Sequence, residues 1–98
     1  MVTLHIHLRV RSGQEARFEE LYQKTYVPAI SKQEGFRRTQ LLRPYEGGSE
    51  YEIDIYFDSE DLRERWANSP EHQEVWPQVE EMCAESTPRG FDILAEDS

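Results

Sequence analysis

Hydrophobic and polar residues alternate along residues 2–11, which predicts a strand with one buried and one polar face. His5 and His7 lie on the polar side, and aliphatic residues form the other side: Val2, Leu4, Ile6, Leu8 and Val10. Residues 14–32 instead follow the period of a helix, with one apolar stripe: Phe18, Leu21, Tyr22, Thr25 and Ala29. Because Pro28 falls inside this stripe, we expect the last turn of the helix to be separate or kinked.

A β-hairpin is predicted in the middle of the chain. Residues 35–44 form a less regular strand, and residues 51–57 alternate strictly between apolar and polar positions. Gly47 and Gly48 lie between them and supply the positive φ angles that a tight reversal needs. The two segments are therefore expected to pair as antiparallel neighbours.

A helix in two parts is predicted after the hairpin. Asp58 and Ser59 are good N-caps for a first part over residues 60–67, in which Leu62 and Trp66 share one face. The first part is short, and a second start signal follows it closely.

That second signal is Ser69 as N-cap with Pro70 at the first helical position. It opens a helix over residues 70–85, which Pro88 is expected to end. Residues 89–95 then form a last short strand.

The predicted order is β-α-β-β-α-β, and residues 1–98 are expected to be a single domain. This is the α+β, ferredoxin-like split βαβ pattern, a four-stranded antiparallel sheet with its helices on one face. The first and third strands are then neighbours, so His5 and His7 lie beside Glu52 and Asp54. A chain of 98 residues has a thin core, so we expect the uncovered face to meet a second sheet in a homodimer.

The charge and composition exclude several partners. The formal net charge is −9, from 20 acidic and 11 basic residues, so no nucleic acid is expected as a ligand. No apolar run approaches the roughly 20 residues that span a bilayer, and the N-terminus does not resemble a signal peptide, so we expect no membrane association and a cytoplasmic location. Cys83 is the one cysteine, so it forms no disulfide within the chain.

The second part of the last helix carries the candidate chemistry. His72 and Trp76 share its inner face with Val75 and Val79. His72 lies in the first turn, where the helix dipole disfavours a positive charge, so a lowered pKa and a neutral, basic imidazole are expected. A bend at Pro77 leaves a gap for a small molecule. The alternative, which the sequence leaves open, is a buried histidine whose hydrogen bonds are satisfied, between tryptophans that fill the core.

Two further groups of residues are candidate sites. Tyr26 could add a phenol to the pocket, although a helix tyrosine with an apolar body and its hydroxyl in water is the more common case. His5 and His7 could bind a metal ion together with Glu52 or Asp54, but a ladder of opposite charges is the simpler interpretation, and we expect no metal and no other cofactor.

Three motifs in order along the chain carry a resemblance to a known family. They are Gly13 at the start of the first helix, "EGF" at residues 34–36, and Ser69 with His72 three residues later. Together with the strands and helices around them, they make the chain resemble the antibiotic biosynthesis monooxygenase domain of the dimeric α+β barrel superfamily. The resemblance implies a homodimer and, in each subunit, a pocket between helices and sheet. Some members oxidise phenols or quinols of several fused rings with dioxygen, without metal or flavin.

By this analogy, His72 is the base and Trp66 is a wall and N–H donor. Trp76 is then the floor, and Tyr26, Ile6 and Phe57 also line the substrate pocket.

A haem-degrading branch of the family uses an asparagine on the first strand, a tryptophan that Trp66 matches, and a histidine on the last helix. Ile6 and Trp76 stand at the asparagine and histidine positions, so haem degradation is not expected. The leading hypothesis is a cofactor-independent monooxygenase acting on an aromatic small molecule. The alternatives are a non-catalytic dimeric module that binds small molecules or adds stability, and an isomerase or cyclase of the same superfamily.

Overall fold

The structure, a computed structural model, describes residues 1–97 and has the predicted order of elements. A π-helical turn, η1, joins α1 to α2. The elements are β1 (Val2–Val10), α1 (Glu15–Leu21), η1 (Tyr22–Tyr26), α2 (Val27–Ser31), β2 (Phe36–Leu42), β3 (Glu50–Phe57), α3 (Glu60–Ala67), α4 (Pro70–Met82) and β4 (Cys83–Asp92).

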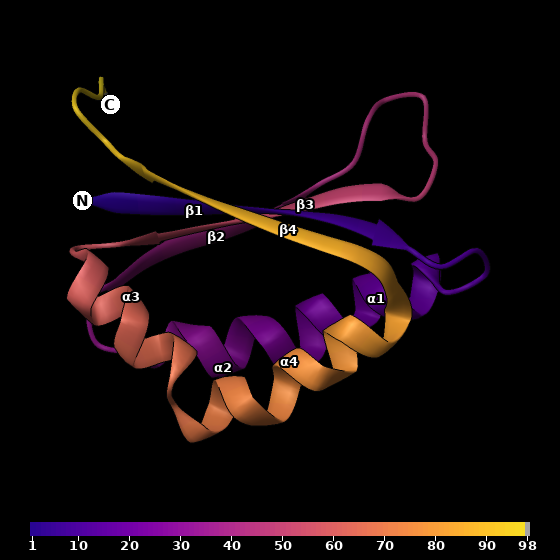
Figure 1. Ribbon diagram of the computed structural model, residues 1–98, viewed down its shortest axis with the longest axis horizontal. Helices are drawn as coiled ribbons and strands as arrows, with labels where there is room; N and C mark the ends of the chain where they lie inside the picture. The colour runs from indigo at the N-terminus through magenta and orange to yellow at the C-terminus, as the bar shows by residue number, and fades with distance from the viewer. Residues whose placement is uncertain (98) are drawn as a thin grey trace.

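The four strands form one antiparallel sheet in the order β2-β3-β1-β4, and the helices lie together on one of its faces (Figure 1). The predicted α+β, ferredoxin-like fold is therefore confirmed. No helix in the described part of the chain is long and apolar enough to cross a membrane.

The hydrophobic core lies between the inner face of the sheet and the helices. The β1–β3 register pairs Ile6 with Ile53 and Leu8 with Tyr51, so these side chains point to the same face. The helices cover them with fully buried residues: Phe18, Ile30, Val75 and Val79. On the outer face, His5 is opposite Asp54, and no helix lies over them (Figure 1). The alternation in the sequence thus assigned both faces correctly.

The first helix contains a π turn that the sequence pattern did not predict. In η1, the N–H of Val27 donates to the carbonyl of Tyr22, five residues earlier. This wider turn directs both Tyr22 and Tyr26 into the core and leaves Thr25 exposed, so the expected inward position of Thr25 was wrong. Pro28 follows at the start of α2, where its missing N–H costs little. The last turn is separate, as expected.

The end of α4 differs from the sequence prediction. The helix stops at Met82, and β4 begins at Cys83, which pairs with Val10 of β1. Pro88 does not terminate a helix but lies inside β4, opposite Ile6. Because β4 is an edge strand, one side of its backbone has no partner strand, and a proline is tolerated there.

Candidate functional site

Ser69 positions the two residues expected to carry the chemistry. Its hydroxyl donates a hydrogen bond to the carbonyl of Trp66 at 2.7 Å and accepts one from the N–H of His72 at 3.1 Å. The predicted N-cap is thus confirmed, and it also ties the end of α3 to the start of α4. His72 and Trp66 are held together as a result, although they belong to different helices.

Five ring-bearing side chains form a continuous row through the helical layer. Tyr22 stacks on Tyr26 at 5.6 Å between ring centroids, and Tyr26 meets Trp66 edge-on at 5.7 Å. His72 contacts Trp66 edge-on at 4.9 Å and stacks on Trp76 at 5.6 Å, with their planes 14° apart. Four of the predicted site residues therefore lie side by side: Tyr26, Trp66, His72 and Trp76.

Two buried polar atoms in this row lack hydrogen-bond partners in the described part of the chain. They are Nδ1 of His72 and the hydroxyl of Tyr26, and they lie on either side of Trp66. Buried polar groups are usually paired, because an unpaired one costs about 1 to 3 kcal/mol. The row thus has unused capacity for hydrogen bonds with a ligand.

Burial alters the acidity of both groups. It lowers the pKa of His72, and the positive charge of Arg63 lowers it further. The expected direction is confirmed, and burial on the predicted inner face, rather than the helix dipole, is the largest cause. Burial also raises the pKa of the Tyr26 phenol, which therefore stays protonated at neutral pH. The row thus pairs a neutral base with a neutral hydrogen-bond donor.

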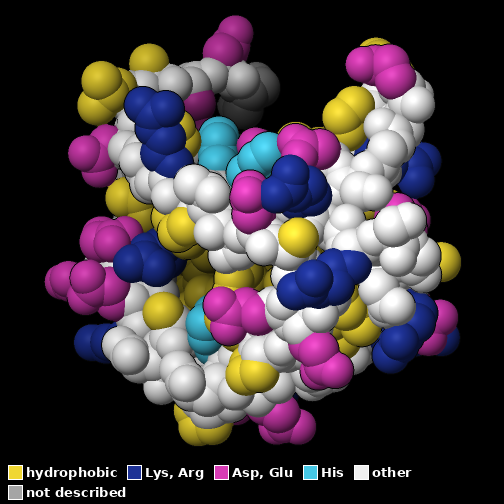
Figure 2. All heavy atoms as spheres, turned by 45° about the vertical axis from the view of Figure 1, so that its right-hand side comes forward, with side chains coloured by type: hydrophobic (Ala, Val, Ile, Leu, Met, Phe, Trp, Pro, Cys, Tyr) yellow, Lys and Arg dark blue, Asp and Glu magenta, His cyan; other side chains and the backbone are white. Residues whose placement is uncertain are grey.

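The surface is hollowed between the sheet and the helices (Figure 2). The register with β1 places Ser86, Pro88 and Gly90 on the inner face of β4, yet all three remain exposed. Their side chains are too small to reach the helical layer. Hydrophobic side chains wall the hollow, and a histidine side chain is visible at its margin (Figure 2). Close to the start of α3, a cavity of about 260 Å³ extends between Gly90 and Glu60.

The remaining predicted site residues lie in the packed core. Ile6 is 5% exposed on the inner face of β1, and Phe57 is fully buried on β3 against Phe36. They belong to the same apolar cluster as Tyr26 and Trp66, and the half-buried Trp76 packs against it. Trp66 and Tyr26 are each 1% exposed, so His72 and Trp76 are the accessible members of the row.

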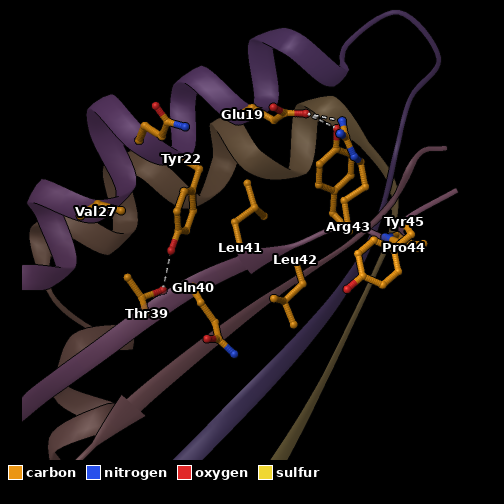
Figure 3. A pocket seen from close by; sticks show the side chains of 12 residues that line it. Glu19, Tyr22, Val27, Thr39, Gln40, Leu41, Leu42, Arg43, Pro44 and Tyr45 are labelled. Carbon is orange, nitrogen blue, oxygen red and sulfur yellow. Dashed lines mark hydrogen bonds and ion pairs between the residues drawn. The ribbon is translucent and has the colours of Figure 1, made fainter. Parts of the chain in front are cut away.

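A second cavity, of about 620 Å³, lies over β2 and was not predicted from the sequence (Figure 3). The hydroxyl of Tyr22 is hydrogen-bonded to that of Thr39 at 3.0 Å, and burial raises the pKa of Tyr22. Arg43 pairs with Glu19 at 3.2 Å, and the hydroxyl of Tyr51 donates to the same carboxylate. The sequence placed Tyr22 in the buried stripe but gave no indication that Thr39 of β2 lies opposite it, which explains why this cavity was missed.

The outer face of the sheet carries a polar cluster. Nδ1 of His5 lies 3.8 Å from the carboxylate of Glu52, and Nε2 of His5 lies 3.8 Å from that of Asp54. Nε2 of His7 pairs with the carboxylate of Glu50 at 3.1 Å. The pKa of the Glu52 carboxyl is raised, mainly because the acidic group of Asp54 lies close to it. The predicted proximity of these side chains is confirmed.

Comparisons with known proteins agree with this architecture. Residues 1–77 match the family model described as "Antibiotic biosynthesis monooxygenase". The structure of SnoaB, a cofactor-independent oxygenase from Streptomyces nogalater, superposes with a TM-score of 0.86 at 22% identity, over 97% of this chain and 94% of that one. A putative antibiotic biosynthesis monooxygenase from Bordetella bronchiseptica gives 0.85 at 21%, over 96% and 97%.

A third similar structure is MhuD with two manganese protoporphyrin IX molecules bound per active site. It gives a TM-score of 0.81 at 20% identity, over 100% of this chain and 99% of that one. No curated protein matches the chain by sequence. At these identities, the structural matches establish the shared fold.

Proposed function

The chain belongs to the antibiotic biosynthesis monooxygenase family, and on that premise we propose that it oxidises an aromatic small molecule with dioxygen, without a cofactor. The substrate class is a phenol, quinol or anthrone of several fused rings. Such a molecule, once deprotonated, supplies the electrons itself. In an anthrone, the methylene carbon between two rings becomes a carbonyl: one oxygen atom of O₂ enters the product and the other leaves as water.

In this proposal, His72 is the base. Its Nδ1 is buried and has no hydrogen-bond partner among the described residues, and its lowered pKa keeps the imidazole neutral and able to accept a proton at neutral pH. This is the observation that carries the proposal. A substrate O–H or acidic C–H placed against Nδ1 gives the buried nitrogen a partner and starts the reaction.

The neighbouring rings bind and orient the substrate. Trp76, stacked on His72 and half-buried, moves aside to admit a planar ring system from the hollow. Trp66 forms the wall, and Tyr26 donates a hydrogen bond to the oxyanion that develops on the substrate. Ile6 and Phe57 supply the apolar surface of the sheet beneath it.

The active form is a homodimer in this proposal. Every residue of β4 from Ala84 to Asp92 is exposed, and the outer face of the sheet is uncovered (Figure 1). Phe91 is 39% exposed on that face, with Arg89 over its ring. A second sheet packed on this face would shelter these apolar and cationic groups.

A non-catalytic dimeric module is the second candidate. Trp66 and Tyr26 are almost fully buried, which is the packing expected if the aromatic row only fills the core. An isomerase or cyclase is a further alternative, since it would use the same neutral base without dioxygen.

Oxygen consumption separates these functions. Purified protein, treated with a chelator, is incubated with a panel of anthrones and quinols in an oxygen electrode, and the products are analysed by mass spectrometry. We expect uptake of one O₂ per product, and a loss of about 10²- to 10⁴-fold in kcat for His72→Gln. His7→Gln is the matched control, because His7 lies on the outer face.

An unchanged rate in His72→Gln would contradict the role of His72. No oxygen uptake with any member of the panel would favour the non-catalytic module, and conversion without oxygen would favour an isomerase or cyclase.

A further inference from the structure

The outer face of the sheet gathers three side chains that can bind a metal, and we propose that His5, Glu52 and Asp54 bind a divalent transition-metal ion such as Zn²⁺. One donor atom from each residue lies within 4.8 Å of the others. His5 is directly opposite Asp54 across β1 and β3, and Glu52 is two residues from Asp54 on the same face. From the sequence alone, a ladder of opposite charges was the simpler interpretation of these positions.

The carboxylate of Asp54 is the strongest argument for this site. Asp54 is 3% exposed, and the amide of Gln40 donates to its Oδ2 at 2.8 Å. Its Oδ1 is also buried, yet it has no hydrogen-bond partner in residues 1–97. The closest imidazole nitrogen, Nε2 of His5, is 3.8 Å away, which is too far for a hydrogen bond. A cation between the two atoms would satisfy both.

Small side-chain rotations bring the donors to binding distance. Ligand atoms about 2.0 to 2.2 Å from a tetrahedral Zn²⁺ lie about 3.3 to 3.6 Å apart. The side chains of His5 and Glu52 are about one third exposed (35% and 34%), so Glu52 is free to rotate and His5 can turn against the ring of Phe91, on which it packs. Asp54 is fixed by burial and by Gln40, which acts as a support for the ligand.

The donor set selects the type of ion. One imidazole nitrogen with two carboxylate oxygens suits Zn²⁺ and similar transition metals, and water would complete the coordination. Mg²⁺ and Ca²⁺ prefer shells made entirely of oxygen ligands. We therefore expect Zn²⁺ or Co²⁺ to bind far more tightly than Mg²⁺ or Ca²⁺.

This site is distinct from the proposed reaction site, but it lies on the face that we propose meets the second subunit, so a bound ion would be enclosed between the two sheets. The cluster lies on the outer face of the sheet, whereas the aromatic row lies on the helical side. A neighbouring pair on the outer face, His7 and Glu50 at 3.1 Å, has the same residue types but is about half exposed, so it provides a matched control.

Zn²⁺ binding to the metal-free full chain tests the proposal. Calorimetry measures the affinity and stoichiometry, and the visible absorption of bound Co²⁺ reports its coordination. We expect one ion per chain and at least about tenfold weaker binding in Asp54→Asn, Glu52→Gln and His5→Gln. His7→Gln and Glu50→Gln should bind as the unmodified chain does. Circular dichroism verifies the fold of each variant, and Glu52→Gln keeps the test valid if the buried Asp54→Asn does not fold.

Two outcomes overturn the proposal. One is the absence of Zn²⁺ binding to the unmodified chain. The other is binding that is weakened as much by His7→Gln and Glu50→Gln as by Glu52→Gln, because that would indicate general attraction to an acidic surface.

Discussion

The imidazole of His72 stands at right angles to the indole of Trp66, with ring centroids 4.9 Å apart. Ser69 holds this arrangement through one hydrogen bond to the backbone of each residue. Three residues close in the sequence thus join the end of α3 to the start of α4. His72 lies beside Trp76 there, with a buried Nδ1 that has no hydrogen-bond partner within residues 1–97.

The stability of the protein should depend on pH through His72. Burial holds its pKa below the ordinary value of about 6.5, so the unfolded chain binds a proton more readily than the folded chain. Acidification through pH 6.5 should therefore decrease the free energy of unfolding, and His72→Gln should show a smaller decrease. Urea unfolding between about pH 5 and pH 7.5 measures the difference, with His7→Gln as control. Equal slopes in the unmodified chain and His72→Gln would argue against a lowered pKa.

A larger side chain at Gly90 should block the hollow. A Cβ atom there lies 3.7 Å from Leu4, which is ordinary contact, so Gly90→Val should fold and even gain strand propensity. If the substrate binds in the hollow, KM should rise by at least about tenfold while the melting temperature is maintained. Thr39→Val, in the cavity over β2, is the control. A rise in KM in Thr39→Val alone would indicate that the substrate binds in the cavity over β2 instead.

Alanine at Gly35 should be strongly destabilising. The φ angle is +80°, and a Cβ atom would clash with Cδ1 of Leu62 and lie 3.0 Å from its Cβ. Backbone strain and the clash together predict a loss of about 2 to 4 kcal/mol in chemical unfolding. Gly13→Ala, with a positive φ and open space, should lose only about 1 to 2 kcal/mol. Equal losses of stability in the two variants would show that the clash with Leu62 does not contribute.

A charge at Phe91 should weaken the proposed dimer. Phe91 packs on His5 at 4.9 Å and is 39% exposed on the outer face. Light scattering should give two chains per particle at micromolar concentration, and Phe91→Asp should shift the mass towards one chain. Leu94→Asp, at a residue that is 93% exposed beyond the end of β4, should not. A monomer mass for the unmodified chain would count against the dimer.

The sequence predicted β1 and β3 better than the helices and β4, for a physical reason. A strand repeats every two residues, so the alternation around Ile6 and Ile53 identifies the inner face without ambiguity. The π turn at Tyr22 to Tyr26 depends on tertiary packing, and the helical period placed Thr25 inward in error. At Pro88, the choice between a helix stop and an edge strand depends on pairing with β1, which is distant in the chain.

The candidate site was predictable to a similar extent. The caps at Ser69 and Pro70 and the helical phase brought His72 and Trp76 together correctly. The burial of Asp54 and its vacant oxygen depend on Gln40 and on the neighbouring strand, so only the folded chain reveals them.

Pro88 also affects how molecules of this protein meet one another. An edge strand with free N–H and C=O groups can pair with a strand of another chain, and this is a common route to aggregation. Proline lacks an N–H and interrupts such pairing in the middle of β4. The same residue that is accommodated at this edge of the sheet thus discourages strand addition along β4, and it favours contact between faces over pairing of that edge when two copies associate.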